Sequence, residues 1–404
     1  MAAKLTSSFE DLVKAKRVPG IGAIVLDKSG KQLYNSSFGT INANDENAAP
    51  FTNDTQLLVW SCTKLITSIC ALQLLEQGKL SLDDPVSKYL PREADVQVCE
   101  RLDENSKPIL RKQKTEMKII HLMTHTAGYT YDFFGDDTIM HGYRAARGEI
   151  SSLLNPSLEW QYNDMFLVHD PGTKHHYGIN SDKLGFVVEA VSGLKLADYV
   201  AKYITTPLGM NNSGRLYKDD HWLRVHIKDE QGNLTAVEAI QPAVTNWKDG
   251  GGHFLISTLN DYSQVLLAIL NEGTHPGTGN SILKPETVRD YLFRDFIPEI
   301  GCSSENIGLV KKGLVPGMSN TGDVGYTFPG GPRGWSCGLM INKEDAPGAR
   351  KAGSGAWAGM GNQYFWIDPV AGLAGITGSQ CPPFMDADVV GMAAEVERFA
   401  YEGR

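Results

Sequence analysis

Strand-like runs at both ends of the chain, separated by a long helical middle, constrain its fold most. Near the start, "GAIVLDKSGKQLYNSSFG" holds two β-rich runs around a glycine-containing turn, which is typical of a hairpin. Near the end, "GWSCGLMIN", "GNQYFWIDP" and "GLAGITGSQ" are three short strand candidates joined by turns. Because the apolar faces of strands must pack against other elements, this pattern predicts one sheet built from both termini.

The middle of the chain predicts helices. "DKLGFVVEAVSGLKLADYVAKYITTPLGM" indicates two helices that are separated at residues 192–195. We therefore expect an α/β fold of the α+β kind, with an antiparallel sheet flanked by helices and an inserted, mostly helical subdomain. Residues 1–90 and 250–404 would form the sheet subdomain and residues 91–249 the helical one, with the active site between them.

Apolar periodicity predicts the remaining helices, and polar composition predicts a loop at residues 99–114. After Ser61, apolar residues recur with a spacing near 3.6, which predicts a helix with one face in the core and an end at Gly78. Further helices are expected at residues 8–16, at 118–128, from about 260, and at 387–403.

Charge and composition exclude several classes of protein. The 404 residues carry a net charge of -9 with both signs interspersed, so we expect no nucleic-acid partner. The sequence shows neither an apolar run of membrane length nor an N-terminal secretory pattern, so we expect no membrane partner and a cytoplasmic protein. Its six cysteines form no C-x-x-C pair, and the histidines show no metal-binding spacing, so we expect free thiols, no metal and no cofactor.

Ser61 and Lys64 form an S-x-x-K pair at the start of the predicted central helix. A serine hydroxyl becomes a strong nucleophile only when a base within about 3 Å takes its proton. Residues i and i+3 share a face of a helix, so Lys64 could reach Ser61, and the Ser61 N–H would be free to hold an oxyanion. The alternative is a serine that only caps the helix.

Two further segments could complete such a site. Tyr177, in "HHYGINSDKLG", could act as a base beside a cation, although a buried tyrosine with one hydrogen bond is the common case. In "GSGAWAGMGNQYFWIDP", small residues ahead of a strand would let a substrate approach the backbone, and a strand-edge N–H could complete an oxyanion hole. A glycine-rich hairpin without catalytic function has the same pattern.

Together these segments resemble the serine β-lactamase-like superfamily and, within it, the class C-like branch of esterases, D-aminopeptidases and acyltransferases. The resemblance also includes "ALQLLEQGKLSLDDPVSKYLP", "IIHLMTHTAGY", "PLGM" and "GGGHFLISTLNDY", and it covers most of the chain. The polar stretch 100–118 is similar to an insertion in fungal acyltransferases that move an acyl group from a thioester to a polyketide alcohol. The resemblance implies a β-lactamase-like sheet flanked by helices.

The resemblance also implies roles for individual residues. Ser61 would be the acylated nucleophile, Lys64 would assist its deprotonation, and Tyr177 would be the base and proton shuttle. The backbone N–H groups of Ser61 and Met360 would form the oxyanion hole. The segment Trp357, Ala358, Gly359 would stand where β-lactamases have Lys-Thr-Gly, and the missing lysine argues against β-lactams as main substrates because a carboxylate in a cleft favours a cation.

Aromatic residues could line an apolar substrate pocket, although any single one of them is more often part of a core. We expect Tyr129 and Phe134 to bind substrate, together with the Trp357–Gly359 segment. The full set of aromatic candidates is Tyr129, Tyr131, Phe133, Phe134, Trp335, Trp357, Tyr364 and Phe365. His125 could replace lysine as the base, but Ser61 lacks the G-x-S-x-G pattern, and we expect His125 to pack at a helix end.

These observations predict a serine hydrolase or acyltransferase that transfers an acyl group from an ester or thioester to water or to an alcohol of a secondary metabolite. The donor could be a small molecule, an acyl carrier or a polyketide synthase. Two alternatives stay open: an amidohydrolase of the β-lactamase or D-aminopeptidase kind, and a binding protein that has kept the scaffold but not the chemistry.

Overall fold

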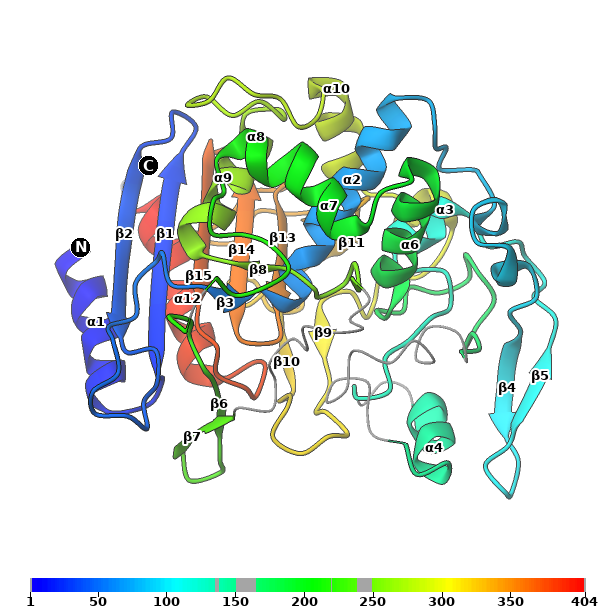
Figure 1. Cartoon of the computed structure of the whole chain (residues 1–404), viewed down its shortest axis with the longest axis horizontal. Helices are drawn as coiled ribbons and strands as arrows, with labels where there is room; N and C mark the ends of the chain where they lie inside the picture. Colours follow the sequence, from blue (N-terminus) through cyan, green and yellow to red (C-terminus); the bar gives the residue numbers. More distant parts are fainter. Residues whose placement is uncertain (1, 135–137, 150–164, 219, 238–248, 403–404) are drawn as a thin grey trace.

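A computed structural model describes residues 2–134, 138–149, 165–218, 220–237 and 249–402. Its centre is a seven-stranded antiparallel sheet with the order β11-β12-β13-β14-β15-β1-β2 (Figure 1). The first two strands along the chain are β1 (Gly20–Asp27) and β2 (Gln32–Gly39). The other five are β11 (Arg333–Trp335), β12 (Met340–Asn342), β13 (Gly355–Gly359), β14 (Gln363–Asp368) and β15 (Leu373–Gly378). Because β1 pairs with β15, the prediction of one sheet built from both termini is confirmed.

Helices cover both faces of this sheet. Successive residues of a strand point to opposite faces, so Phe365 and Trp366 of β14 mark the two sides. The ring of Phe365 packs against Tyr262 of α9 (Leu259–Leu270), with ring centroids 5.4 Å apart. The ring of Trp366 packs against Tyr401 of α12 (Ala387–Tyr401) at 5.5 Å. The second face is completed by α1 (Ala2–Lys14), which contacts α12 and β2 (Figure 1).

Helix α2 (Thr63–Glu76) runs through the interior of the molecule. Every residue from Thr63 to Leu74 is buried, so the expectation of a single core-facing side is wrong. A helix enclosed on all sides must satisfy its polar side chains internally. The Thr67 hydroxyl donates to the Gly251 carbonyl at 2.6 Å, and the Gln73 amide donates to the Ile282 carbonyl at 2.8 Å. The helix ends before Gly78, which has φ +68° as predicted for a C-terminal glycine.

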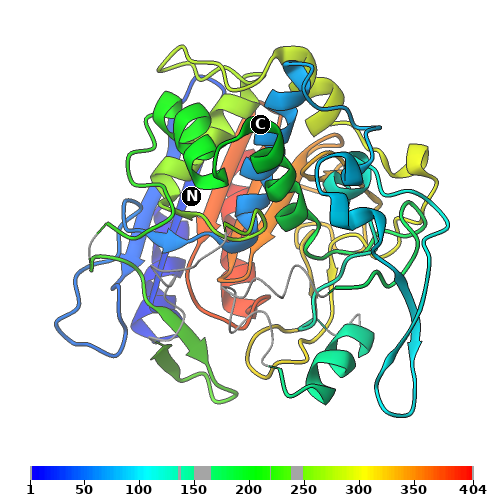
Figure 2. The same ribbon diagram turned by 45° about the vertical axis from the view of Figure 1, so that its right-hand side comes forward.

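The described middle of the chain contains several helices and two short hairpins, and Figure 2 shows its helices beside α2. Its longest described helix is α6 (Asn180–Ser192), which packs on α2 and on α3 (Ile119–Met123). The second predicted helix is divided into α7 (Leu196–Val200), a π-helical turn η4 (Ala201–Thr205) and α8 (Thr206–Leu208). Helix α4 (Thr138–Ala146) also lies here, while residues 150–164 and 238–248 are outside the described chain.

One segment expected to be a loop is a hairpin. Strands β4 (Val98–Leu102) and β5 (Pro108–Arg111) pair within residues 99–114, where the polar composition predicted no regular structure. The apolar side of β4 is covered by tertiary packing, because Cys99 is buried with Met140 of α4 and Phe166. Strand structure here is decided by those neighbours rather than by the local sequence.

The remaining elements are short. They are β3 (Leu57–Leu58), η1 (Trp60–Cys62), η2 (Val86–Lys88), η3 (Pro91–Ala94), β6 (Val225–Lys228), β7 (Leu234–Val237), β8 (Ile256–Ser257), α10 (Pro285–Thr287), η5 (Val288–Leu292), α11 (Ile297–Ile300), β9 (Leu309–Val310) and β10 (Gly322–Asp323).

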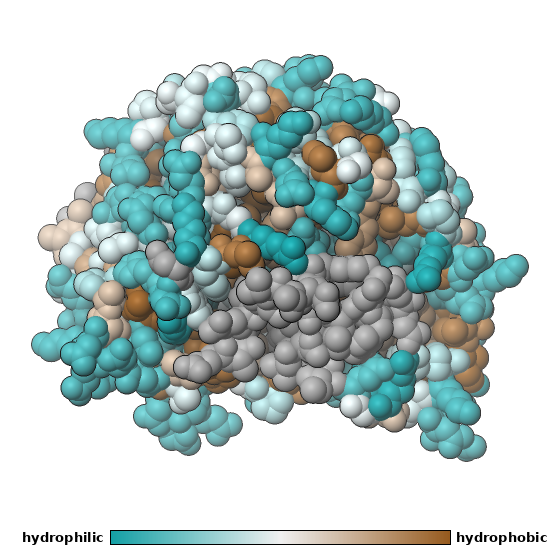
Figure 3. Space-filling model, in the orientation of Figure 1, coloured by the Kyte–Doolittle hydropathy of each residue, from teal (hydrophilic) through white to brown (hydrophobic). Residues whose placement is uncertain are grey.

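Hydrophilic side chains dominate the molecular face drawn in Figure 3. The large apolar side chains that are exposed on described residues are well separated along the chain: Leu110, Leu216, Leu309 and Val370. None of the helices within the described ranges combines the length and the apolar character needed to cross a bilayer.

Candidate active site

Ser61 lies in the single turn η1, between strand β3 and helix α2. The preceding residue, Trp60, has φ +47°, a left-handed conformation that is rare for residues other than glycine and that gathers at functional sites. Helix α2 begins only at Thr63, and no side chain caps it. Ser61 is therefore not an N-cap, and its hydroxyl oxygen accepts a hydrogen bond from Lys64 instead.

Lys64 lies on the first turn of α2 and is only 2% exposed. Its Nζ atom is 3.0 Å from the Oγ atom of Ser61, 3.1 Å from the hydroxyl of Tyr131 and 3.0 Å from the carbonyl oxygen of Gly252. These three partners use the full bonding capacity of a lysine amine. The Gly252 carbonyl can only accept, whereas the hydroxyls of Ser61 and Tyr131 can also exchange a proton with the amine.

Gly252 is held in turn by a buried carboxylate. The Asp182 Oδ1 atom accepts from the Gly252 N–H at 3.1 Å and lies 3.5 Å from Nε2 of His253. A Cβ atom on Gly252 would stand 2.8 Å from Asp182 and 3.0 Å from Nζ of Lys64. Any side chain at residue 252 would therefore have to displace one of these two groups.

The aromatic ring of Tyr177 lies beside the amine of Lys64. The Nζ atom of Lys64 lies 4.9 Å from the ring centroid, and the Tyr177 hydroxyl accepts a hydrogen bond from Trp357 Nε1 at 3.2 Å. The hydroxyl that directly contacts Lys64 belongs to Tyr131, which is buried. Spacing from Ser61 gives no signal for Tyr131, and the sequence indicated it only as one of several candidate aromatic residues in "GYTYDFF".

The end of strand β13 lies against the turn that carries Ser61. A Cβ atom on Gly359 would come within 2.6 Å of the Val59 carbonyl oxygen, and one on Gly361 within 2.9 Å of Nε1 of Trp60. Small residues are thus required here for packing against this turn. Met360 lies between these two glycines and is 6% exposed.

Aromatic rings surround this group. The ring of Tyr177 packs against Trp357 at 4.9 Å, and that of Phe134 lies 6.3 Å from Tyr177. Trp335 packs edge-on against Trp357 at 4.5 Å. Ala358 is buried in β13 beside Trp357. The structure thus brings Phe134 and the Trp357–Gly359 segment to the site.

Tyr129 lies elsewhere. It is fully buried, its hydroxyl donates to Glu93, and Lys183 sits 5.1 Å above its ring while pairing with Glu93 at 2.7 Å. Burial and the Glu93 carboxylate raise the pKa of the Tyr129 hydroxyl well above its usual value. Tyr129 is therefore part of a buried polar network. Tyr364 and Phe365 of β14 are also buried and belong to the core.

His125 is buried and takes no part in the contacts of Ser61 and Lys64. Its Nδ1 atom accepts hydrogen bonds from the Asn180 amide at 3.1 Å and from the Gly178 N–H at 3.4 Å. Burial holds the pKa of His125 well below the usual value for histidine. Its ring packs edge-on against Trp335 at 5.1 Å. Nearby His175 is also buried, which lowers its pKa to about 3. Within the described ranges, no group of three or more His, Cys, Asp or Glu side chains could hold a metal ion.

Cys62 follows the candidate nucleophile but is fully buried, and burial raises the pKa of its thiol. A protonated, enclosed thiol is a poor nucleophile. The Cys62 carbonyl oxygen accepts a hydrogen bond from the Tyr262 hydroxyl at 2.8 Å, and this bond helps to fix the turn.

Comparison with known proteins identifies the family of this chain. The Beta-lactamase family model matches residues 5–395 of the 404. The chain belongs to the Beta-lactamase family. The predicted superfamily and fold are thereby confirmed.

Relatives within the family are acyl-transferring enzymes. The chain is 28% identical to the monacolin J acid methylbutanoyltransferase of Aspergillus terreus, over 95% of this chain and 91% of the relative. It is 27% identical to the lovastatin esterase of Penicillium rubens, over 96% of this chain and 94% of the relative. The structure superposes on a mutant of simvastatin synthase from Aspergillus terreus with a TM-score of 0.83 at 26% identity, covering 99% and 96% of the two chains. This member of the Beta-lactamase family is an enzyme of the serine esterase or acyltransferase kind, as the sequence predicted.

Proposed function

We propose that the enzyme works through an acyl-enzyme on Ser61. The observation that carries this proposal is the 3.0 Å contact between Nζ of Lys64 and Oγ of Ser61, in a buried site where Lys64 has two other partners. Ser61 Oγ attacks the carbonyl carbon of an ester or thioester while its proton passes to Lys64. The tetrahedral intermediate then expels the alcohol or thiol, which takes a proton on leaving, and the acyl group stays on Ser61.

The two tyrosines would have different tasks. Tyr131 contacts Lys64 directly, so we assign it to proton exchange with Lys64 during acylation. Tyr177, whose hydroxyl is oriented by Trp357, would be the base that takes the proton of the incoming alcohol or water. The family pattern favours Tyr177, and the hydrogen bonds favour Tyr131 as the immediate partner of Lys64.

The N–H groups of Ser61 and Met360 would hold the oxyanion that forms in both steps. This assignment is supported by the close approach of Gly359 and Gly361, at the end of β13, to the turn that carries Ser61. Preorganised donors of this kind contribute much of the rate enhancement, about 10²–10³-fold for one donor.

The acyl acceptor would be an alcohol of a secondary metabolite, or water, and the donor an ester or thioester. The rings of Phe134 and Trp357, which pack against Tyr177, would suit apolar acyl or ring groups. Two of the relatives are named for methylbutanoyl transfer to monacolin J acid and for lovastatin esterase activity, which supports a polyketide-like alcohol or ester. The donor could be presented by an acyl carrier or polyketide synthase, in a cytoplasmic setting. Residues 91–249 would form the subdomain that closes the site against residues 1–90 and 250–404.

Amidohydrolysis is the second candidate, because it is the activity after which the family is named. Trp357 stands at the position where the resemblance places the lysine that grips a β-lactam carboxylate, and its N–H is committed to Tyr177. A chromogenic cephalosporin should therefore be turned over at least about 10²-fold more slowly than an activated ester, because the carboxylate lacks a cation.

The test is the intact mass of the protein after brief mixing with excess p-nitrophenyl butyrate, beside Ser61→Ala, with peptide mapping. A butyryl adduct on Ser61 that is absent from the variant is expected. Its decay with and without added alcohols then separates acyl transfer from hydrolysis. Folded protein that gives no adduct and no nitrophenol would overturn the proposal in favour of a binding protein, and an adduct on Cys62 would identify a different nucleophile.

A further inference from the structure

We propose that Asn362 is a positioning residue for the oxyanion hole, because its side-chain amide fixes the turn that carries the Met360 N–H. The inference rests on the proposed function, since that function gives the Met360 N–H its role. Asn362 itself would touch no substrate. It would act through the turn between β13 and β14, which consists of Met360, Gly361 and Asn362.

The turn has a defined geometry that makes Asn362 suitable. Gly359 and Gln363 pair across the hairpin, and the Asn362 N–H donates to the Gly359 carbonyl at 3.0 Å. Asn362 has φ +68°. Hairpin loops of three residues often end with a residue in this left-handed conformation, and asparagine adopts it more readily than most residues. The backbone of Asn362 therefore closes the turn, but its side chain is free to make other contacts.

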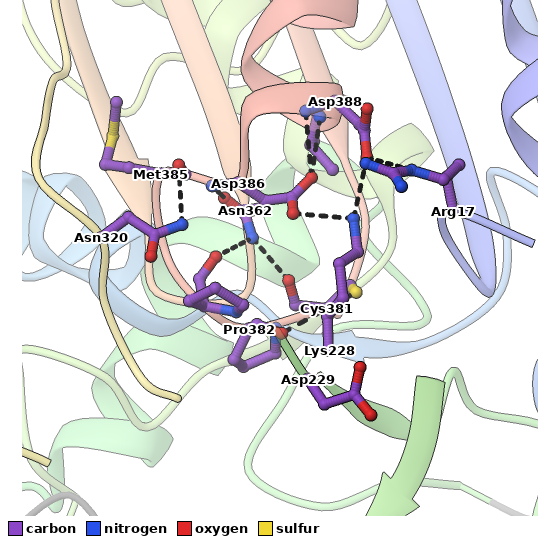
Figure 4. Close-up of polar contacts among 12 residues, drawn as sticks. Arg17, Lys228, Asp229, Asn320, Asn362, Cys381, Pro382, Met385, Asp386 and Asp388 are labelled. Carbon is purple, nitrogen blue, oxygen red and sulfur yellow. Dashed lines mark hydrogen bonds and ion pairs between the residues drawn. The ribbon is translucent and has the colours of Figure 1, made fainter. Parts of the chain in front are cut away.

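The Asn362 side chain is fully buried and uses all of its hydrogen-bonding capacity. Its Nδ2 atom donates to the carbonyl oxygens of Cys381 at 2.6 Å and Pro383 at 2.9 Å. Its Oδ1 atom accepts from the Tyr364 hydroxyl at 2.7 Å and from the Asp386 N–H at 3.2 Å. Figure 4 shows the amide pointing into the chain segment that contains Cys381, Pro382 and Asp386. We call this segment, residues 379–386, the collar.

The collar is anchored to distant parts of the chain. Lys228 of β6 donates to Asp386 at 2.7 Å and to Asp388 at 3.0 Å, and Arg17 donates to Asp388 at 2.9 Å (Figure 4). The side chains of Lys228 and Asp386 are buried, with 6% and 7% exposed, so this pair is shielded from solvent. The collar is thus a rigid frame for the turn.

The same collar also reaches the segment that leads to Ser61. Gln380 Oε1 accepts from the Leu58 N–H at 2.8 Å, and Leu58 ends the strand three residues before Ser61. Backbone bonds from Ser379 and Cys381 hold the turn at the carbonyls of Asn362 and Gly361, at 3.2 and 3.1 Å. One frame therefore fixes both segments that would supply oxyanion donors. Such donors are effective only when they are held within about 0.5 Å of the productive geometry.

Asn362→Gly tests this arrangement, because glycine accepts the left-handed backbone while the side chain and its four hydrogen bonds are removed. Asn320→Ala is the matched control, since Asn320 contacts the collar at the Met385 carbonyl, at 3.4 Å, without touching the turn. Rates with p-nitrophenyl butyrate are normalised to the fraction of Ser61 that a fluorophosphonate labels at completion. We expect Asn362→Gly to lower kcat by about 10- to 100-fold with KM within about 3-fold, because only the transition state uses the oxyanion hole. Asn320→Ala should stay within about 2-fold of the wild type in both constants.

A boronic acid supplies a readout that a purely structural role would not move. The tetrahedral adduct of n-butylboronic acid with Ser61 places an oxygen in the oxyanion hole, so its inhibition constant should rise by about the same factor as kcat falls. Tyr364→Phe is the second variant, because it removes one hydrogen bond to Asn362 and keeps the ring. It should lower kcat by about 2- to 5-fold, again without a change in KM.

The outcomes separate the two proposals. A wild-type protein without an adduct on Ser61 would refute the proposed function and, with it, this inference. The inference alone would be overturned by a different result. In that case the wild-type protein is acylated on Ser61, and Asn362→Gly and Tyr364→Phe both keep kcat and boronate affinity within about 2-fold of the wild type. Where Asn362→Gly does not fold, Tyr364→Phe decides by the same two constants.

Discussion

The Nζ atom of Lys64 lies 3.0 Å from the Oγ atom of Ser61, although Ser61 is in a short turn and Lys64 is on the helix that follows it. The Gly252 carbonyl and the Tyr131 hydroxyl occupy the other two directions around this amine. Of these three partners the Gly252 carbonyl has no proton to give, whereas the hydroxyls of Ser61 and Tyr131 can each exchange a proton with the amine.

Replacing Lys64 should abolish acylation without unfolding the protein. Lys64→Met keeps the length of the side chain and removes the amine, so kcat/KM for p-nitrophenyl butyrate should fall by at least about 10³-fold. The variant should still fold, with a loss of about 1–3 kcal/mol in the free energy of unfolding because the buried Gly252 carbonyl loses its Lys64 donor. Lys88→Met is the control, since that side chain is 52% exposed. A Lys64→Met enzyme with more than a tenth of wild-type activity would contradict the assigned role.

The two tyrosines should affect different steps. Tyr131→Phe should slow the nitrophenol burst that reports acylation, and Tyr177→Phe should slow transfer of the acyl group to an added alcohol, each by about 10²–10⁴-fold as expected for general acid–base catalysis. Rapid mixing with p-nitrophenyl butyrate, with and without alcohol, measures both steps. If Tyr177→Phe alone slowed the burst, Tyr177 and not Tyr131 would be the partner of Lys64.

Stability should depend on a buried ion pair far from the site. Arg350 and Glu397 lie 2.6 Å apart with side chains only 1% and 0% exposed. Glu397→Gln leaves the guanidinium without its counter-charge, which should lower the free energy of unfolding by about 3–5 kcal/mol. The control is Glu299→Gln, which removes an exposed partner of Arg294 and should change stability by less than about 1 kcal/mol. Urea unfolding followed by tryptophan fluorescence measures both, and equal effects would refute the prediction.

Stability should also fall as the pH is lowered from 7 to 5, partly because of His175. Burial lowers its pKa in the folded protein to about 3, whereas an unfolded histidine has a pKa of about 6.5. Between these values the unfolded chain binds the extra proton, so stability is full above about pH 6.5 and is lost as the pH falls toward 3, by at most about 1.4 kcal/mol per pH unit.

His175→Gln should reduce this pH dependence, and the exposed His221→Gln should not. The measurement is the melting temperature at pH 7, 6 and 5. An unchanged slope in His175→Gln would contradict the prediction and would show that other histidines, such as the half-buried His121 and His169, whose pKa values partial burial lowers to about 4, dominate the effect.

The sequence determined what depends on local spacing. The Ser61 and Lys64 pair, the glycine at the end of α2 and the hairpin β1–β2 follow from backbone periodicity and turn chemistry, and the structure has each of them. The family followed from the order of several such motifs. The hairpin β4–β5 did not follow, because its apolar partners on α4 and near Phe166 are distant in the chain.

Contacts between distant segments were decided only by the tertiary structure. Tyr131 is 67 residues from Lys64, and Gly252 is 188 residues away, so no local pattern predicts that both contact the same amine. The enclosure of α2 and the burial of Tyr129 likewise depend on neighbours elsewhere in the chain. The sequence by itself determined the candidates Ser61, Lys64 and Tyr177, because they follow from residue type, spacing and the order of motifs. Only the folded structure decided which hydroxyl meets Lys64 and what holds Asn362, because burial and hydrogen bonding across the sheet and helices set those distances.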